Sequence, residues 1–148
     1  MKTFNHGKPG RTIVLRLDPG DDVLDCVNQA IEAHQIRDGY IASGIGTLDE
    51  CVLHMVMTTG YPPVEYFARW QDKPLEVASI SGIIAEGFPH LHTVISDHEK
   101  AYAGHLERGC RILYLGEVVI QEILNQPLTR RRNAKNINEL TDRDCSAE

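Results

Sequence analysis

The sequence predicts an α+β fold with one principal helix near the N-terminus and a mainly antiparallel sheet. Two observations lead to this class. Only one segment, at about residues 22–35, repeats apolar side chains at helical spacing. Most other segments are short, rich in β-branched and apolar residues, and separated by turn signals. One helix followed by many strands disfavours a series of parallel strands joined by helices, so we expect antiparallel pairing.

Size and composition fit one globular domain with its own core. The chain has 148 residues, and its balance of 42% hydrophobic and 24% charged residues is that of an ordinary globular protein. No apolar run approaches the roughly 18 residues of a membrane helix. Residues 1–10 are polar and lack the apolar stretch of a secretory signal. We therefore expect a cytoplasmic protein without membrane contact.

The first elements expected are a strand and the principal helix. Residues 12–17 are rich in β-branched and apolar side chains and predict a strand. A turn signal follows at residues 18–20, after which Asp21 or Asp22 can cap the helix. One apolar stripe marks the side of this helix that faces the core: Val23, Leu24, Val27, Ala30 and Ile31.

Further strands are expected along the rest of the chain. They lie at residues 51–57, 64–70, 75–84, 90–96 and 110–124, with a break at residues 87–89. Residues 44–47 lack the third glycine of a dinucleotide-binding motif and indicate a tight turn at a strand end instead. Residues 97–104 predict a turn, with a short helix as an alternative.

The four cysteines are scattered and form no Cys-x-x-Cys pair, which argues against a zinc ribbon and against a redox motif. They are Cys26, Cys51, Cys110 and Cys145. We expect all four to be reduced thiols, and the first three to be small core side chains, because each lies among apolar residues.

Composition changes at Asn125, so we expect a domain at residues 1–124 and a C-terminal extension at residues 125–148. The net charge is −7 over the first part and +1 over the second. The basic residues at 130–135 indicate a solvated segment, a segment docked on an acidic neighbour or, as the weaker alternative, a contact with nucleic acid. An acidic body disfavours non-specific binding to nucleic acid, because that binding draws its affinity from neutralised phosphates.

Three histidines form the most informative pattern. In a strand, residues two apart point to the same face, so His90 and His92 lie side by side and Leu91 faces the other way. A turn after this strand can bring His105 back beside them, with Gly104 allowing close approach. The remaining histidines lack a neighbour at ligand spacing, and we interpret His54 as a core or interface side chain.

Three neutral imidazoles suit Zn²⁺ best, although other divalent transition metals also accept imidazole. Three histidines with water in the fourth position are the pattern of a catalytic zinc site, which turns the bound water into a nucleophile. The alternative interpretation of the His90-Leu91-His92 motif is that it lies on an exposed strand edge and binds no metal. Acidic and polar candidates for a general base or an outer hydrogen-bond partner lie near in sequence: Glu86, Asp97, His98 and Glu99.

Several motifs, in order, resemble a known family, the PPC domain, named for plants and prokaryotes and also called the domain of unknown function 296. They are residues 43–48 (Ser-Gly-Ile-Gly-Thr-Leu), 74–77 (Pro-Leu-Glu-Val), 79–82 (Ser-Ile-Ser-Gly), 90–92 (His-Leu-His), 104–106 (Gly-His-Leu) and 116–120 (Gly-Glu-Val-Val-Ile). The similarity runs over about residues 11–124 and is closest to the stand-alone prokaryotic members.

This resemblance implies a compact domain with an antiparallel sheet that assembles as a homotrimer. It also implies a zinc site in the prokaryotic members, with ligands at His90, His92 and His105. Plant members carry AT-hooks before the domain and act on chromatin, and many prokaryotic members are labelled DNA-binding. This chain has no Arg-Gly-Arg-Pro hook.

Two functional hypotheses follow from different classes. The first is a trimeric PPC-domain protein with a three-histidine zinc site, associated with DNA and regulatory in role. The alternative is a metal-dependent enzyme of the hydrolase or lyase type, which acts on a small molecule through zinc-activated water, with Glu86 or Glu117 as base. An open coordination position and a pocket favour the enzyme, whereas a closed metal shell and a basic trimer face favour the DNA-associated protein.

Overall fold

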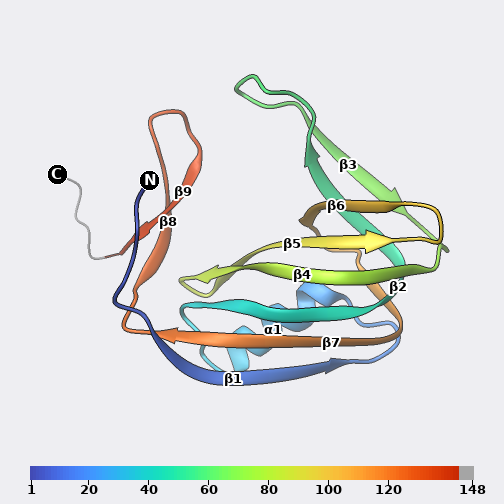
Figure 1. Ribbon diagram of the computed structural model, residues 1–148, viewed down its shortest axis with the longest axis horizontal. Helices are drawn as coiled ribbons and strands as arrows, with labels where there is room; N and C mark the ends of the chain where they lie inside the picture. Colours follow the sequence, from blue (N-terminus) through green and yellow to red (C-terminus); the bar gives the residue numbers. More distant parts are fainter. Residues whose placement is uncertain (144–148) are drawn as a thin grey trace.

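The fold of the protein, seen in a computed structural model, is mainly β (Figure 1). The structure describes residues 1–143. Among these residues strand accounts for 59% and helix for 8%, so the expected α+β class is wrong. In chain order the elements are β1 (Lys8–Leu17), α1 (Val23–Ala33), β2 (Gly39–Val56), β3 (Glu65–Trp70), β4 (Leu75–Ala85), β5 (Phe88–Ser96), β6 (Ala101–Leu106), β7 (Arg111–Leu124), β8 (Leu128–Arg132) and β9 (Asn138–Asp142).

The expectation failed because strands take up segments that the sequence pattern assigned to turns or left unassigned. β2 runs continuously from Gly39 through residues 44–47, where a tight turn was expected. β5 starts at Phe88, inside the expected break, and the turn is confined to Glu86 and Gly87. No short helix forms at residues 97–104, because a turn ends at Lys100 and β6 begins directly after it.

Seven strands form one antiparallel sheet in the order β1-β7-β2-β4-β5-β6, with β3 paired to β2. The 18-residue β2 has two halves with different partners. Its first half lies between β7 and β4, and its second half pairs with β3 and with β6. The sheet therefore closes on itself through β2, β4, β5 and β6, which brings the ends of distant segments together.

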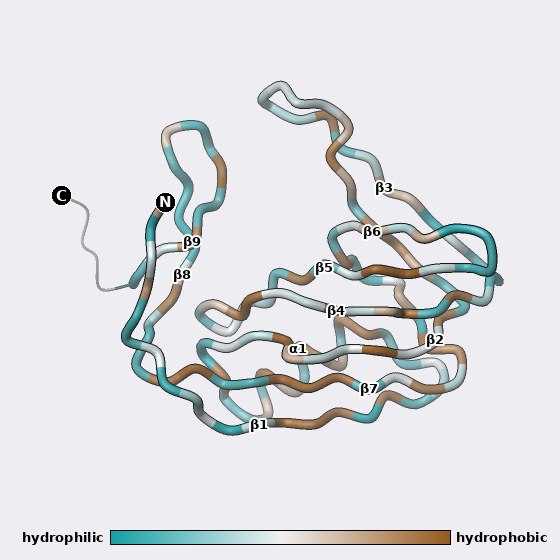
Figure 2. The backbone as a smooth tube through the Cα atoms, in the orientation of Figure 1, coloured by the Kyte–Doolittle hydropathy of each residue, from teal (hydrophilic) through white to brown (hydrophobic). Residues whose placement is uncertain are grey.

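The helix α1 begins and packs as its sequence predicts. The Asp22 carboxylate caps its N-terminus by accepting a hydrogen bond from the Asp25 backbone N–H at 3.0 Å. Its apolar stripe joins a core built from the buried sides of β1, β2, β4, β5 and β7, and Cys51 and Cys110 are buried in that core. Figure 2 shows largely apolar stretches along β1, β5 and β7. No helix within residues 1–143 is both long enough and apolar enough to cross a membrane.

Part of the C-terminal extension folds as the hairpin β8–β9 and docks on the domain. The buried Asp38 carboxylate accepts hydrogen bonds from the Leu128 backbone N–H at 3.0 Å and from Arg143 Nη2 at 2.7 Å. Figure 1 shows this hairpin rising on one side of the sheet, with the β2–β3 arm rising on the other. Of the expected thiols, Cys145 lies outside the described residues.

Candidate metal centre

Strand alternation in β5 places His90 and His92 on one face. Leu91, between them, is buried in the core on the opposite face. The neighbouring strand β4 approaches this point very closely, because Gly82 lies opposite Leu91 with φ of +149°. A Cβ at Gly82 would stand 2.0 Å from the carbonyl oxygen of His90, so only glycine permits this pairing. The position of His90 thus depends on a glycine in the adjacent strand.

The third histidine is delivered by the β5–β6 hairpin. The Asp97 carboxylate shapes the turn by accepting the backbone N–H groups of Glu99 and Lys100, both at 2.8 Å. β6 then runs back along β5, and His105 lies directly opposite His92 in the register. The expected return of the chain therefore occurs, and all three histidines come together.

The three side chains form a compact set of possible ligands. Their ligand nitrogens all lie within 4.8 Å of one another, and His90 Nε2 and His92 Nε2 are 3.3 Å apart. The ring of His105 stands almost perpendicular to the other two rings. Two nitrogens that share one tetrahedral zinc, at about 2.0–2.1 Å each, lie roughly 3.4 Å apart. The His90–His92 pair thus has the spacing of two ligands on one metal ion, and the three residues form a group that could hold a metal.

Electrostatics favour the neutral form of His90 and His105, whose pKa values are lowered. Partial burial lowers the pKa of His90, and the nearby His105 and Arg130 lower it further. Partial burial also lowers the pKa of His105, with His92 and His54 as additional causes. A metal ion binds the neutral ring, so crowding of the three rings prepares them to act as ligands.

Two residues that the sequence pattern did not assign to the metal site, His54 and Glu107, lie close to His105. His54 on β2 is its register partner, and the Glu107 carboxylate lies near both rings. One oxygen of Glu107 is 4.0 Å from His105 Nε2 and 3.7 Å from His54 Nδ1. His54 Nε2 is buried without a hydrogen bond, at 3.5 Å from a Glu65 oxygen. Only the pairing of β2 with β6 reveals this group, and no local spacing signals it.

The histidines open into a cavity of about 780 Å³ between the β8–β9 hairpin and the second half of β2. Its lining residues are His54, Met55, Val56, His90, His92, Ala103, Gly104, His105, Arg130 and Asn138. They include no carboxylate. Among the residues that the structure describes, the metal-ligand group contains the three histidines and no fourth member. A metal held there would therefore face the cavity.

The two proposed bases lie elsewhere. Glu86, in the β4–β5 turn, accepts a hydrogen bond from Thr129 Oγ1 at 2.7 Å and stands 3.7 Å from Arg37. Glu117 is exposed on β7, opposite Arg16 of β1. Neither side chain lines the histidine cavity. A catalytic role for either residue stays a prediction.

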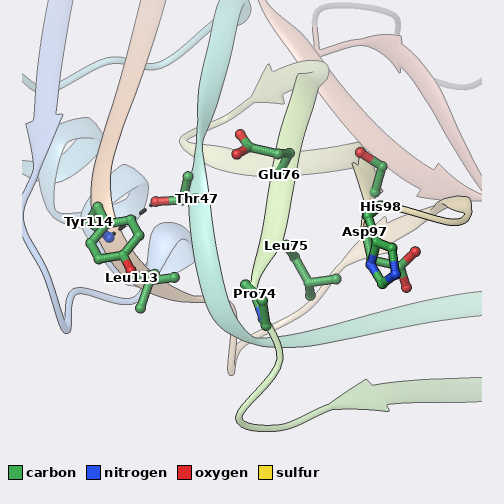
Figure 3. Close-up of a pocket in the computed structure, with 9 residues that line it drawn as sticks. Thr47, Pro74, Leu75, Glu76, Asp97, His98, Leu113 and Tyr114 are labelled. Carbon is green, nitrogen blue, oxygen red and sulfur yellow. Dashed lines mark hydrogen bonds between the residues drawn. The ribbon is translucent and has the colours of Figure 1, made fainter.

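Another cavity, of about 310 Å³, lies beside the start of β4 and contains Asp97 and His98 (Figure 3). Asp97 is already occupied by the ammonium group of Lys73 and two backbone N–H groups, which hold the pKa of its carboxyl well below the usual range. Thr47 Oγ1 on the opposite side accepts the Tyr114 backbone N–H at 3.1 Å. This cavity shares no residue with the histidine cavity, so Asp97 and His98 do not contact the three histidines.

Comparison with known proteins confirms the resemblance inferred from the motifs. The pattern of the Plants and Prokaryotes Conserved (PCC) domain matches residues 4–124. A plant- and prokaryote-conserved (PPC) protein from Pyrococcus horikoshii has a structure that superposes with a TM-score of 0.80, at 20% identity over 95% of this chain and 98% of that one. A metal-containing protein from Archaeoglobus fulgidus matches with a TM-score of 0.76, at 24% identity over 92% of this chain and 95% of that one.

Two further relatives carry functional names. A protein from Bacteroides thetaiotaomicron, described as a candidate DNA-binding protein, has a TM-score of 0.78, at 18% identity over 93% of this chain and 99% of that one. The bifunctional protein GlmU of a Synechococcus strain is 26% identical over 122 residues. That match covers 82% of this chain but only 18% of the curated relative.

Proposed function

Because the chain belongs to the Plants and Prokaryotes Conserved domain family, we propose that it is a homotrimeric zinc-binding protein whose three-histidine site faces a small-molecule cavity. The observation that carries this proposal is the convergence of His90, His92 and His105, whose ligand nitrogens lie within 4.8 Å of one another. The metal-containing relative from Archaeoglobus fulgidus gives it independent support.

The surroundings of the three histidines favour the small-molecule hypothesis over a purely structural metal. Structural zinc sites are usually closed by four protein ligands, whereas this group has three within the described part of the chain and opens into a cavity of about 780 Å³. Zinc bound there would supply Lewis-acid chemistry of the kind used by hydrolases and lyases. The chain's own contribution is to hold three imidazoles on two paired strands, in a cavity wall that has no carboxylate among the described residues.

The metal content of the purified protein tests this site. Protein loaded with zinc and then freed of excess metal should retain about one zinc per chain, measured by mass spectrometry. The double variant His90→Ala with His92→Ala should retain almost none, because two of three ligands are lost. His98→Ala is the matched control, since that side chain is exposed and lies outside the group. Stoichiometric zinc in the double variant would exclude the assigned ligands.

Trimeric assembly is supported by the apolar side chains that the sheet leaves exposed. They include Val14, Tyr40, Ile45, Val94, Tyr114 and Leu115 on β1, β2, β5 and β7. Exposed apolar surface of this extent is typical of faces that bind another protein. Light scattering should give the mass of three chains, and a monomeric mass at micromolar concentration would contradict the proposal.

Association with DNA is the second candidate role, and the description of the relative from Bacteroides thetaiotaomicron favours it. The net charge of −6 opposes it, since phosphate contacts dominate affinity for DNA. We expect weak binding that disappears between about 50 and 200 mM salt, as measured by fluorescence anisotropy with duplex DNA. Tight, sequence-selective binding at physiological salt would instead establish the DNA-associated role.

A further inference from the structure

Arg130, from the docked hairpin, forms part of the wall of the histidine cavity. Its guanidinium donates to two backbone carbonyls of the β4–β5 hairpin, to Phe88 at 3.1 Å and to Ile83 at 2.9 Å. A guanidinium carries five N–H donors, so these two bonds leave three donors for other partners. The contacts hold the side chain beside the histidines, since His90 lies on the strand that begins at Phe88.

The positive charge of Arg130 has no carboxylate partner among the described residues. Within residues 1–143, no carboxylate oxygen lies within 4.0 Å of its guanidinium, whereas Arg11, Arg111 and Arg143 each pair with a carboxylate. The pKa of Arg130 reflects the same difference, because burial lowers it and no carboxylate raises it. A half-buried charge without a counter-charge is costly, and such a charge in a cavity is typical of a site that takes an anion.

We infer that this cavity binds a small organic anion, a carboxylate or a phosphate ester, whose negative group lies between Arg130 and the metal held by the three histidines. The inference rests on the proposed zinc site and adds the chemical class of its ligand. Both groups attract an oxyanion, because the guanidinium can donate hydrogen bonds to one oxygen atom while zinc coordinates another oxygen of the same carboxylate or phosphate.

The remaining wall of the cavity fits an organic rather than an inorganic ligand. Its volume of about 780 Å³ lies in the usual range for small-molecule sites and far exceeds that of a free phosphate ion. Met55, Val56 and Ala103 offer apolar contacts, and the Asn138 amide offers a further hydrogen bond. Because no carboxylate of residues 1–143 lines the cavity, a cationic ligand would find no counter-charge from this part of the chain.

Titration calorimetry with simple anions tests the inference. Inorganic phosphate and acetate serve as probes, each titrated into zinc-loaded protein freed of excess metal and into metal-free protein. Both should bind more tightly to the zinc-loaded form, and the tighter of the two identifies the natural ligand as a phosphate ester or a carboxylate. Arg130→Gln should weaken binding about tenfold or more while zinc content stays the same, because charge-assisted hydrogen bonds contribute about 1.5–3 kcal/mol.

Two further variants separate the site from general electrostatics and from misfolding. Arg132→Gln removes the same charge from the same strand, but Arg132 is exposed, bonds to Asn136 and does not line the cavity, so its anion affinity should match the wild type. Arg130→Lys keeps the charge and should bind anions more tightly than Arg130→Gln.

The outcomes distinguish failure of this inference from failure of the zinc site. Anion binding that requires zinc but is the same in wild type and Arg130→Gln would overturn the role of Arg130 and leave the metal site intact. Equal weakening by Arg132→Gln would reduce the effect to net charge and overturn the inference as well. Absence of zinc from the wild-type protein would overturn the proposed metal site itself.

Discussion

The Glu107 carboxylate lies near two imidazoles, that of the candidate ligand His105 on β6 and that of His54 on β2. It is 4.0 Å from His105 and 3.7 Å from His54, which lie opposite each other on β6 and β2. Metal-bound histidines commonly donate their other ring N–H to a carboxylate, which orients the ring and raises its basicity. Glu107 is placed to do this for His105, with a small movement of its half-buried side chain.

We predict that Glu107→Gln lowers zinc affinity about tenfold, since loss of such an outer partner typically costs 10–100-fold. Competition with a chromogenic zinc chelator measures the change. The unfolding midpoint of the metal-free protein should not move, because Glu107 is partly exposed. Glu99→Gln removes an exposed carboxylate that lies beside His98, and it should leave zinc affinity unchanged. Equal affinity in the two variants would show that Glu107 does not orient His105.

At the scale of elements, the β4–β5 hairpin determines whether the histidines can meet. β5 presents His90 and His92 on one face and anchors itself through Leu91 on the other. Gly82 of β4 makes this pairing possible, because its missing side chain leaves room for the His90 carbonyl oxygen. The metal centre therefore depends on backbone packing between two strands as much as on its ligands.

Gly82→Ala should lower the free energy of unfolding by about 2 kcal/mol or more, because the new Cβ must displace β5 and adopt a strained φ. Urea unfolding measures the loss, and zinc affinity should fall with it because His90 moves. Gly60→Ala is the control, since a Cβ there meets no atom within 4 Å. If the free energy of unfolding of Gly82→Ala equalled that of the wild type, the close approach of β4 to β5 at Gly82 would not be needed for stability.

At the scale of the whole molecule, the docked hairpin turns a sheet face into a cavity. β8 and β9 supply Arg130 and Asn138 to its wall, and the hairpin is held by Asp38 at its base. We propose that residues 125–148 are an extension of the domain at residues 1–124 that completes the ligand site. Arg130, one of its basic residues, then contributes to the wall of the ligand site, so a nucleic-acid partner is not needed to explain this residue.

We predict that Arg143→Ala loosens the hairpin and lowers the free energy of unfolding by about 2–3 kcal/mol, because the buried Asp38 carboxylate loses its charged partner. Chemical denaturation measures the change, and limited proteolysis should cut the chain between β7 and β8. Arg16→Ala breaks an exposed ion pair with Asp18 and should cost well under about 1 kcal/mol. Equal stability of the two variants would argue that Asp38 does not anchor the hairpin.

Short-range spacing was enough to identify several features of this chain. The helical period located α1, the two-residue spacing placed His90 and His92 on one face, and the order of motifs pointed to the family. The first two features depend on residues within one or two turns, or within one strand, of each other. Side-chain periodicity reports such relations directly, because it follows from local backbone geometry.

The features that the sequence pattern missed depend on pairing between segments that are distant in the sequence. The mainly β class depends on β2 continuing from Gly39 to Val56. Pairing with β4 and β7 keeps β2 extended across residues 44–47, whose glycines had indicated a turn. His54 meets His105 only because β6 pairs with β2, and Arg130 reaches the cavity only because Asp38 docks the hairpin. Each of these contacts joins segments that are far apart in the sequence. Their energies arise from burial and hydrogen bonds made after the chain has folded, and no local period encodes them.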